Sequence, residues 1–296
     1  MTEIEHILGS EFERNLFAAA LQNLKDSDNK LRYNNFAYSI RELSRHFLHR
    51  LSPDTNILAS NWFEPIADNG KPTRAQRIKY AIQGGFNDEN LRMLGFEVEE
   101  LSDDIKGLKK AIDALSKYTH INPEVFGLSD EEVKRMSDEV LYHFKVFANR
   151  IKDCREDFKH ALEGKIEEQM IDAVISNHYE NVDSLAPHRS LEYSELTEYH
   201  IIDINDKAVV VEVFGKIFFT LEYGSRKERR EGDGLDINED FPFQTKIYYQ
   251  IDSEFPSKNF EIEEFDVDTS DWYDDIDDEE LDLLIDSEID NLDSEK

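Results

Sequence analysis

The chain has 296 residues and a formal net charge of −32, which argues against broad, sequence-independent attraction to nucleic acid or to anionic membrane surfaces. Residues 261–296 hold eighteen acids and one lysine, a charge of −17, so the preceding 260 residues carry only −15 and leave room for local basic surfaces. A single cysteine, Cys154, excludes a disulfide framework within the chain and a cysteine-rich zinc site.

The length and the amino-terminal sequence set expectations for domain number and location. A single hydrophobic core rarely grows far beyond 250 residues, so we expect two domains. The first residues, MTEIEHILGSEFER, carry acids where a signal peptide needs a basic stretch followed by an apolar run, and no stretch reaches 18 apolar residues. We therefore expect a soluble, cytoplasmic protein that has no contact with membranes.

Helical signals fill the first part of the chain. Ser10 with Glu13 forms a capping box that predicts a helix to about Lys25, and Thr73 with Gln76 forms another, which opens a short helix ended by two glycines at 84–85. Helical periodicity continues over residues 88–94 and 103–118. A further helix is predicted from the cap at residue 129 to about residue 162, with a break at Gly164. Trp62, in a connecting segment, is expected to be structural.

The segment 31–54 predicts the most informative helix, which ends where proline follows at position 53. Its apolar side chains recur at steps of three and four and form one face: Phe36, Ile40, Leu43, Phe47 and Leu51. The members of the opposite face are Tyr38, Arg41, Glu42, Arg45 and His49. In so acidic a chain this face indicates either an anionic ligand or partner, or a solvated surface with Arg–Glu pairs.

From about residue 191 the apolar period changes to two or to continuous runs, in the segments LEYSELTEYHIIDI, AVVVEVF, KIFFTLEYG and PFQTKIYYQI. These runs predict strands, with hairpin turns at Asn205-Asp206 and at Gly215 and a long mobile loop over residues 224–240. We therefore expect an α+β fold. Residues 1–180 form a helical domain with the candidate Arg/His site, residues 181–252 a small antiparallel β-sheet domain, and residues 253–296 a disordered acidic tail.

Two segments place an arginine, four residues and a histidine in order, Arg41-ELSR-His46 and Arg155-EDFK-His160. This spacing resembles the R-x(4–6)-H signature of HEPN ribonucleases, although glutamate follows each arginine here. The resemblance implies metal-independent RNA cleavage at a dimer interface, hence a homodimer. In such chemistry a histidine moves a proton at the ribose 2′-hydroxyl or the leaving oxygen, while an arginine stabilises charge on the phosphate. Residues five apart on a helix diverge by roughly 140°, so both reach one phosphate only near a helix end or across a dimer.

Six segments in order give a broader resemblance: RELSRHFLHRLSPD, TRAQRIKYAIQGGF, KYTHI, SLAPH, LEYGS and FPF. Together they resemble the predicted nuclease family associated with prokaryotic PIWI-like defence systems, over residues 30–250. The resemblance implies a prokaryotic protein that acts against phage or plasmids. It assigns no roles, but it carries across as matching positions Arg41, His46, His49, Arg74, Arg77 and His120.

Candidate site residues follow from these patterns. The candidate catalytic residues are Arg41, His46, His49 and His120. The candidate nucleic-acid-binding residues are Arg45, Arg74, Arg77, Arg226, Arg229 and Arg230. The last three belong to the dense basic run RKERR, which could grip a phosphate backbone or receive the acidic tail of the same chain. We expect the arginines and His49 of the segment 31–54 to line a concave surface together with Arg74, Arg77 or His120.

Metal-dependent nucleases need clustered carboxylates, often with a lysine, and no convincing core strand carries such a cluster, so no metal and no cofactor is expected. The function that these features favour is a defence protein that binds RNA or DNA and could cleave it as a hydrolase. The alternative is a non-catalytic interaction module whose acidic tail binds or shields a basic protein partner.

Overall fold

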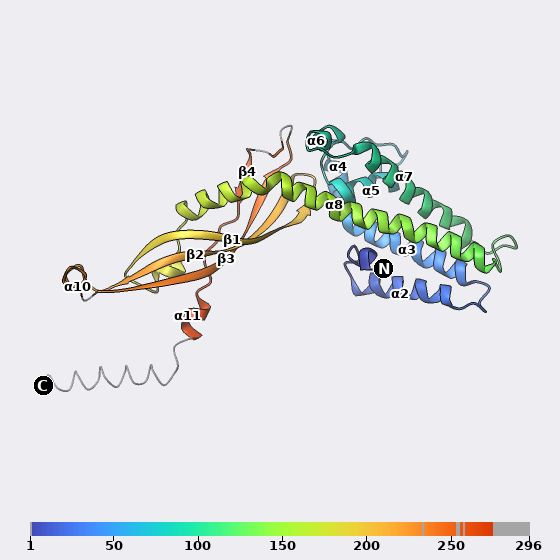
Figure 1. Cartoon of the computed structure of the whole chain (residues 1–296). Helices are drawn as coiled ribbons and strands as arrows, with labels where there is room; N and C mark the ends of the chain where they lie inside the picture. Colours follow the sequence, from blue (N-terminus) through green and yellow to red (C-terminus); the bar gives the residue numbers. More distant parts are fainter. Residues whose placement is uncertain (1, 233, 253–254, 257, 275–296) are drawn as a thin grey trace. The chain divides into compact units, whose positions relative to one another are not determined.

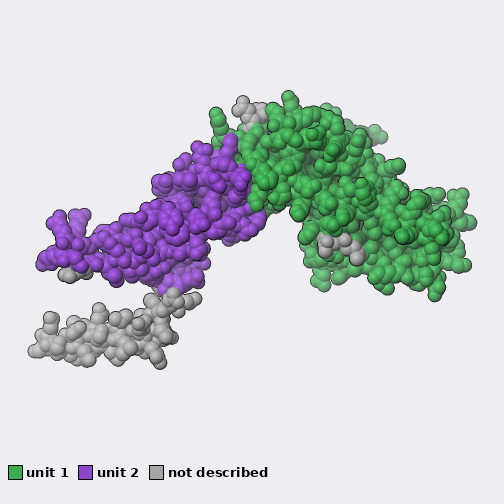
Figure 2. Space-filling model, in the orientation of Figure 1, with its two compact units in different colours: residues 1–162, 201–210, 248–260 green, residues 163–200, 211–247, 261–296 purple. Residues whose placement is uncertain are grey.

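The computed structural model describes residues 2–232, 234–252, 255–256 and 258–274. It has the predicted α+β fold, in which a helical region precedes a four-stranded antiparallel sheet (Figure 1). The chain divides into two compact units, the first formed by residues 1–162, 201–210 and 248–260 and the second by residues 163–200, 211–247 and 261–296 (Figure 2). Among the described helices, none combines the length and the apolar character needed to cross a membrane.

The elements of the helical region are α1 (Thr2–Glu5), α2 (Glu11–Lys25), α3 (Arg32–Leu51), α4 (Asp54–Ala59), α5 (Arg74–Gln83), α6 (Asp88–Met93), α7 (Val98–Leu115), the 3-10 helix η1 (Ser116–Thr119), α8 (Asp130–Ser176) and α9 (Glu180–Asp183). They are followed by β1 (His188–Ile204), β2 (Ala208–Tyr223), α10 (Arg226–Glu231), β3 (Leu235–Gln250), β4 (Phe260–Ile262) and α11 (Ser270–Asp274).

Helix α3 is the centre of the first unit. Its predicted apolar face is buried, with Phe36, Ile40, Leu43 and Phe47 at 0% exposure. The Phe47 ring contacts two rings of α8, those of Phe144 and Phe147, at centroid distances of 5.7 and 5.9 Å. Helices α2, α5, α7 and η1 also pack against α3. Neighbours on several sides therefore fix the rotation of α3 about its axis, and with it the direction of the polar face.

Helix α5 begins and ends where the sequence predicts. The Thr73 hydroxyl accepts a hydrogen bond from Gln76 N, and the Gln76 side chain accepts one from Thr73 N at 2.8 Å. At the other end, Gly84 has a φ of 59°, and a Cβ there would lie 2.5 Å from the Ile204 carbonyl oxygen. Gly85 N donates to the Asn205 carbonyl at 2.9 Å. The two glycines therefore allow the turn between β1 and β2 to contact the end of α5.

Helix α8 continues through Gly164, so the predicted break there is wrong. Buried side chains recur at steps of four on both sides of this glycine: Phe158, Leu162, Ile166, Met170 and Val174. Glycine in a helix interior costs about 1 kcal/mol relative to alanine, which is less than the burial of one large apolar side chain contributes. The continuous apolar face therefore outweighs the single glycine.

The sheet has the strand order β1-β2-β3-β4. The predicted turn at Asn205 is confirmed, since its side-chain oxygen accepts hydrogen bonds from Lys207 N and Ala208 N at 2.9 Å. The predicted turn at Gly215 is wrong, because Gly215 lies inside β2. A Cβ there would lie 2.5 Å from the Phe243 ring and 2.6 Å from the Glu195 carbonyl oxygen, so glycine allows close approach of neighbouring strands.

The turn between β2 and β3 lies farther along, within the segment predicted as a mobile loop over residues 224–240. That prediction is also wrong. Ser225 and Glu228 form a capping box that starts α10, and Gly232, with a φ of 88°, ends it. Strand β3 begins at Leu235 with largely exposed polar residues, which lack the apolar signal of a strand. We call residues 225–232 the hairpin tip.

Part of the segment predicted as a disordered acidic tail is folded. Strand β4 joins the sheet, and Thr245 Oγ1 donates to the Glu263 carbonyl at 2.7 Å. Val267 is 1% exposed and forms a bridge with Phe243, whose ring also lies 5.2 Å from that of Phe265. Apolar side chains between the acids thus pack residues 258–274 against the sheet. The remainder of the predicted tail, residues 275–296, lies outside the described residues.

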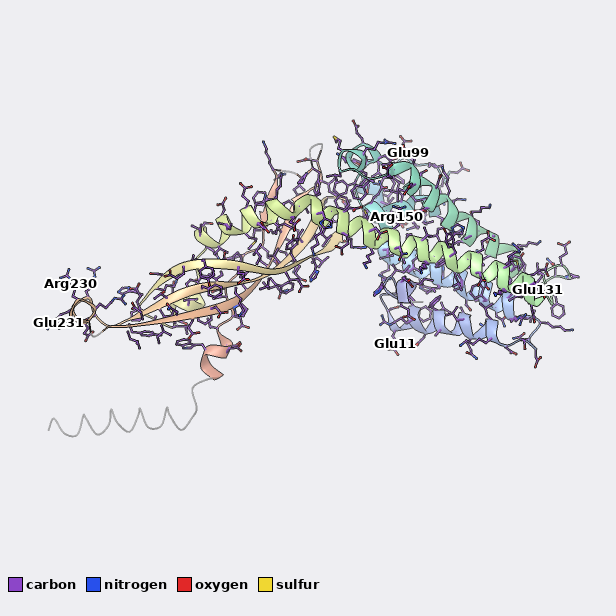
Figure 3. The ribbon with its side chains drawn as sticks, in the orientation of Figure 1. Glu11, Glu99, Glu131, Arg150, Arg230 and Glu231 are labelled. Carbon is purple, nitrogen blue, oxygen red and sulfur yellow. The ribbon has the colours of Figure 1, made fainter. Side chains whose placement is uncertain are left out.

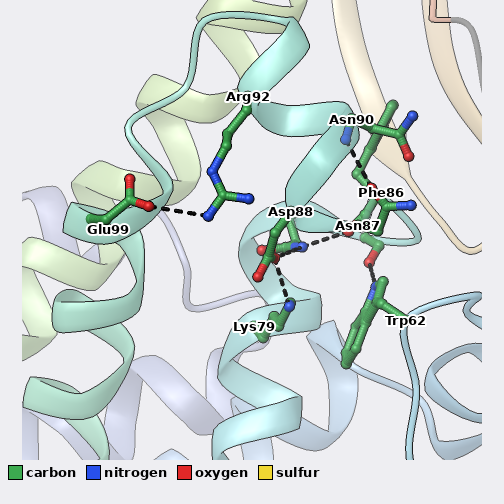
Figure 4. A network of polar contacts seen from close by, with 10 residues as sticks. Trp62, Lys79, Phe86, Asn87, Asp88, Asn90, Arg92 and Glu99 are labelled. Atoms are coloured by element: carbon green, nitrogen blue, oxygen red, sulfur yellow. Dashed lines mark hydrogen bonds and ion pairs between the residues drawn. The ribbon is translucent and has the colours of Figure 1, made fainter.

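Trp62 connects the segment after α4 to the end of α5 (Figure 4). Its indole N–H donates to the Gly84 carbonyl at 2.9 Å. The Lys79 ammonium lies 4.9 Å from the centre of the indole ring and pairs with Asp88 at 2.7 Å. These contacts support a structural role for the half-buried Trp62.

Replacing Trp62 with alanine should lower the free energy of unfolding by about 3 kcal/mol, since it removes the apolar contact, the hydrogen bond and the cation–π contact. Urea denaturation measures this change. The control is Ile66→Ala in the same segment, where the side chain is 72% exposed and the change should stay within about 0.5 kcal/mol. Equal unfolding midpoints for wild type and Trp62→Ala would contradict the structural role.

Candidate functional site

A cavity of about 430 Å³ lies against the polar face of α3. We call it the arginine pocket, and its lining residues are Arg41, Glu42, Ser44, Arg45, Leu48, His49, Ala67, Asn69, Lys71, Pro72, Arg74 and Arg77. Five lysines and arginines thus face one carboxylate. In a chain with a net charge of −32, this concave surface is locally cationic.

Helix geometry explains how these side chains meet. Arg41, Arg45 and His49 follow one another at steps of four, so they lie on one face of α3. Arg74 and Arg77 are three apart in the first turn of α5, which packs against α3. The expected grouping of the α3 residues with Arg74 and Arg77 is therefore what the structure shows.

Arg77 is a structural member of this group. It is 8% exposed and pairs with Asp54 at 2.6 Å. Its Nη1 donates to the Ser52 carbonyl at 3.0 Å, and the Ser52 hydroxyl donates back to the Arg77 carbonyl at 2.6 Å. These bonds tie α5 to the turn between α3 and α4. The Arg77 guanidinium therefore interacts mainly with groups of the protein itself and has few donors left for a ligand.

Arg74 is also paired, but it remains accessible. It forms an ion pair with Asp113 of α7, and Lys109 approaches the same carboxylate at 2.7 Å. One third of the Arg74 side chain is exposed. Because two cations share one carboxylate, this corner of the arginine pocket keeps a positive surplus.

Arg41 and Arg45 share a single carboxylate, that of Glu42. Arg45 lies 2.8 Å from it and Arg41 3.9 Å, and the Arg45 side chain is 63% exposed. Arg41 Nε is buried and has no hydrogen-bond partner among the described residues. A guanidinium has five N–H donors in a planar fork that suits phosphate oxygens, so these two side chains have donors to spare.

Lys71 is the lining cation that the sequence reasoning missed. It is exposed, and within the described part of the chain it forms no ion pair. Its position in the sequence could have indicated this role, because Lys71 stands two residues before the capping residue Thr73 and therefore beside the start of α5. A basic residue next to a helix start that already carries Arg74 and Arg77 belongs to the same surface.

His49 adds a titratable group to the arginine pocket. Burial lowers the pKa of its imidazole, and the positive charge of Arg77 lowers it further. The neutral form, which can accept a proton, is therefore favoured near pH 7. This is the protonation state that a general base needs.

His46 and His120 do not line the arginine pocket. His46 is exposed and its ring packs edge-on against Phe12 at 5.0 Å, because a step of five positions from Arg41 turns it to another face of α3. His120 is exposed after η1, and η1 contacts the start of α3 through a hydrogen bond from Asn34 to the Tyr118 carbonyl. Asn34 and His49 are 15 residues apart, about 22 Å along the helix.

The hairpin tip carries the second basic surface. Arg226, Lys227 and Arg230 are exposed and form no ion pair within the described part of the chain. Arg229 is committed, since it pairs with Glu222 at 3.0 Å and with Asp236 at 2.8 Å. Figure 3 shows Arg230 beside Glu231 at this tip. Arg226 and Arg230 are thus available to a partner, whereas Arg229 fastens the two strands.

Within the part of the chain that the structure describes, no three or more His, Cys, Asp or Glu residues lie close enough together to hold a metal ion. The charged and titratable side chains that line the arginine pocket are five cations, the carboxylate of Glu42 and the imidazole of His49. Such a set can bind a phosphate, stabilise charge that develops on it, and move a proton.

Two family models match, both described as a predicted pPIWI-associating nuclease, the first over residues 5–144 and the second over residues 151–273. The chain belongs to the predicted pPIWI-associating nucleases. The arginine pocket lies in the region of the first model and the hairpin tip in that of the second. Comparisons with curated proteins and with solved structures give no match.

A titration of His49 tests the arginine pocket directly. By NMR its pKa should lie below the ordinary value of about 6.5, and saturation with a short oligonucleotide should raise it, because a nearby phosphate stabilises the imidazolium. The imidazole resonances of His120, which lies outside the pocket, serve as the control and should not respond. If the His49 pKa stays constant at saturation, the oligonucleotide binds elsewhere.

Proposed function

We propose that this protein binds nucleic acid of phage or plasmid origin through the arginine pocket, as part of a prokaryotic defence system. The observation that carries the proposal is the excess of cations that line the cavity: Arg41, Arg45 and Lys71 face the single lining carboxylate of Glu42, while Arg74 and Arg77 pair with Asp113 and Asp54. Arginine is suited to this task because its planar fork matches the oxygens of a phosphate. Membership of the predicted pPIWI-associating nucleases supports the assignment.

The net charge of −32 shapes how such binding works. Repulsion from the acidic surface opposes a long phosphate track, whereas a concave cationic site focuses its field on one or two phosphates. Arg41, Arg45 and Lys71 supply the donors, and Arg226 and Arg230 at the hairpin tip supply a separate contact. We therefore propose a small electrostatic footprint, with a correspondingly shallow dependence of affinity on salt.

Cleavage is the finer part of the proposal. His49 in its neutral form takes a proton from the attacking hydroxyl, either a ribose 2′-hydroxyl or a water, while Arg41 and Arg45 stabilise the charge that grows on the phosphate. As the new oxygen–phosphorus bond forms, the bond from phosphorus to the leaving ribose oxygen breaks, and that oxygen takes a proton from the His49 imidazolium or from solvent. This scheme needs only groups that line the arginine pocket. It replaces the pairing of Arg41 with His46 that the HEPN-like spacing suggests, because His46 packs on Phe12. The homodimer implied by that spacing stays a prediction.

The alternative function, a non-catalytic interaction module, rests on the acidic carboxyl-terminal residues. Residues 275–296 alone hold eleven acids and one lysine, a charge of −10, and they lie outside the described residues. Such a segment would bind or shield a basic protein partner. Under this alternative the arginine pocket carries no nucleic-acid affinity.

Replacing Arg41 and Arg45 together with glutamine should weaken binding of labelled RNA or DNA at least tenfold and reduce the slope of log affinity against log salt by about 2, one for each lost phosphate contact. Fluorescence anisotropy at several salt concentrations measures both effects. The matched control is Arg135→Gln on α8, which removes an exposed arginine that pairs with Glu139 outside the arginine pocket. Unchanged affinity in the double variant, or capture of a basic protein without nucleic-acid binding, would favour the alternative.

A nuclease assay with His49→Gln separates cleavage from binding. Wild type is incubated with RNA and with DNA, each with and without divalent metal. Loss of the proton acceptor should reduce the cleavage rate about 100-fold or more, while the affinity for nucleic acid should stay within threefold of wild type. His46→Gln, three residues earlier and outside the arginine pocket, should keep full activity. Equal rates for His49→Gln and wild type would remove His49 from the mechanism.

A further inference from the structure

A second cavity, of about 830 Å³, lies in the first unit and shares no lining residue with the arginine pocket. We call it the large cavity. Its walls come from α1 and the residues after it, from the end of α3, from α4, α5 and α8, and from the last residues of β1. Its volume falls within the range of about 300–1,000 Å³ that is typical of small-molecule sites in proteins.

Arg155 on α8 is the unusual group in the large cavity. It is half-buried, and burial lowers the pKa of its guanidinium. Its Nη1 donates to the Ile151 carbonyl at 3.3 Å, and within the described residues no carboxylate pairs with it. Desolvating an unpaired charge costs stability, so a folded protein keeps one only where something else compensates.

Other arginines of the same unit show the contrast. Arg50, which also lines the large cavity, pairs with Glu13 at 2.9 Å. Arg150, one and a half turns before Arg155 on α8, pairs with Asp104 at 2.7 Å. Both of these arginines therefore have a carboxylate partner within the protein. Arg155 lines a cavity instead, which leaves its donors for a ligand.

Other side chains that line the large cavity indicate the chemical class of ligand that it can hold. Lys152 lies three residues before Arg155, on the same face of α8, and within the described residues it forms no ion pair. Asp203 of β1 raises the pKa of Arg155, so its carboxylate is close enough to act on that guanidinium. Ile82, Ile202 and Ile204 form an apolar wall.

Tyr80 completes the lining with a buried hydroxyl that lacks a well-formed hydrogen bond among the described residues. Asn56 and the backbone of Asp206 are its polar neighbours, and burial raises the pKa of Tyr80 to about 12, so the hydroxyl stays protonated and able to donate. Cationic donors, two carboxylates, a hydroxyl donor and an apolar wall thus surround one volume. Of the two carboxylates, Glu3 pairs with Lys145 at 2.8 Å, whereas Asp203 acts on Arg155.

We propose that the large cavity binds a free mononucleotide. The phosphate lies against Arg155 and Lys152, the base packs on the apolar wall, and the carboxylate of Asp203 accepts hydrogen bonds from the sugar hydroxyls. A nucleotide fits because it unites an anion, a flat ring with apolar faces and a pair of hydroxyl donors, whereas inorganic phosphate would leave the apolar wall without a contact. The proposal does not depend on the nucleic-acid binding proposed for the arginine pocket.

Calorimetric titration of the full chain with ATP, GTP, AMP and pyrophosphate tests the proposal. At least one nucleotide should bind, and pyrophosphate should bind at least tenfold more weakly because it does not contact the apolar wall. A 5′-phosphorylated oligonucleotide that is too large for the cavity should not compete with the bound nucleotide. Competition by the oligonucleotide, or equal affinity for pyrophosphate, would overturn the assignment to a free nucleotide.

Arg155→Met should weaken nucleotide binding about tenfold or more, the usual effect of losing a charged hydrogen bond. Without ligand this variant should melt at the same or a higher temperature than wild type, because it removes a desolvated, unpaired charge. Arg135→Met, on the same helix with its side chain 69% exposed, is the matched control and should bind like wild type. An unchanged affinity in Arg155→Met would exclude this site.

A second variant tests the cavity without touching a charge. Ile202 is 44% exposed, so Ile202→Trp can fill the large cavity without entering the core, and it should reduce nucleotide binding at least tenfold. The Arg41→Gln/Arg45→Gln variant should bind nucleotide like wild type. If no nucleotide binds wild type at millimolar concentration, or if the arginine-pocket variant loses the binding instead, the proposal is wrong. Oligonucleotide binding is measured separately, so either proposal can fail alone.

Discussion

Burial of one face of α3 is the constraint on which the rest of the first unit depends. Phe47 contacts two rings of α8, and α2, α5, α7 and η1 pack on the same helix. Rotating α3 by one residue, about 100°, would carry Arg41 and Arg45 toward the core and expose apolar side chains. Desolvating these charges is far more costly than leaving them in water. Core packing therefore determines where the cationic face points.

Local signals made most of the helical region predictable. Capping boxes at Ser10 and Thr73 and the period of apolar residues are encoded within a few neighbouring positions, so helix starts follow from the sequence. Gly164 and Gly215 could not be interpreted in this way. The helix cost of Gly164 is outweighed by the continuous buried face of α8, and Gly215 makes room for the Phe243 ring from another strand. The effect of a glycine depends on tertiary neighbours that the sequence does not show.

The candidate site was partly predictable for the same reason. Helical spacing alone places Arg41, Arg45 and His49 together, and the family resemblance adds the arginines of α5. The ion-pair partners could not be predicted, because Asp54 and Asp113 come from other elements. Counting arginines in the sequence therefore overestimates the free positive charge. It also gives no reason to separate His120, since its distance from the pocket is set by where η1 meets α3.

Positive charge is scarce in this chain, and where it stays unpaired is informative. Acids outnumber lysines and arginines by 66 to 34, and among the described residues a half-buried arginine without a carboxylate partner is the exception. Arg41 keeps a buried Nε without a partner and Arg155 keeps a half-buried guanidinium without an ion pair, and each lines a cavity. Stability alone would favour pairing or replacing such groups. Their presence beside open space, in a protein rich in carboxylates, is the physical basis on which both proposed anion sites rest.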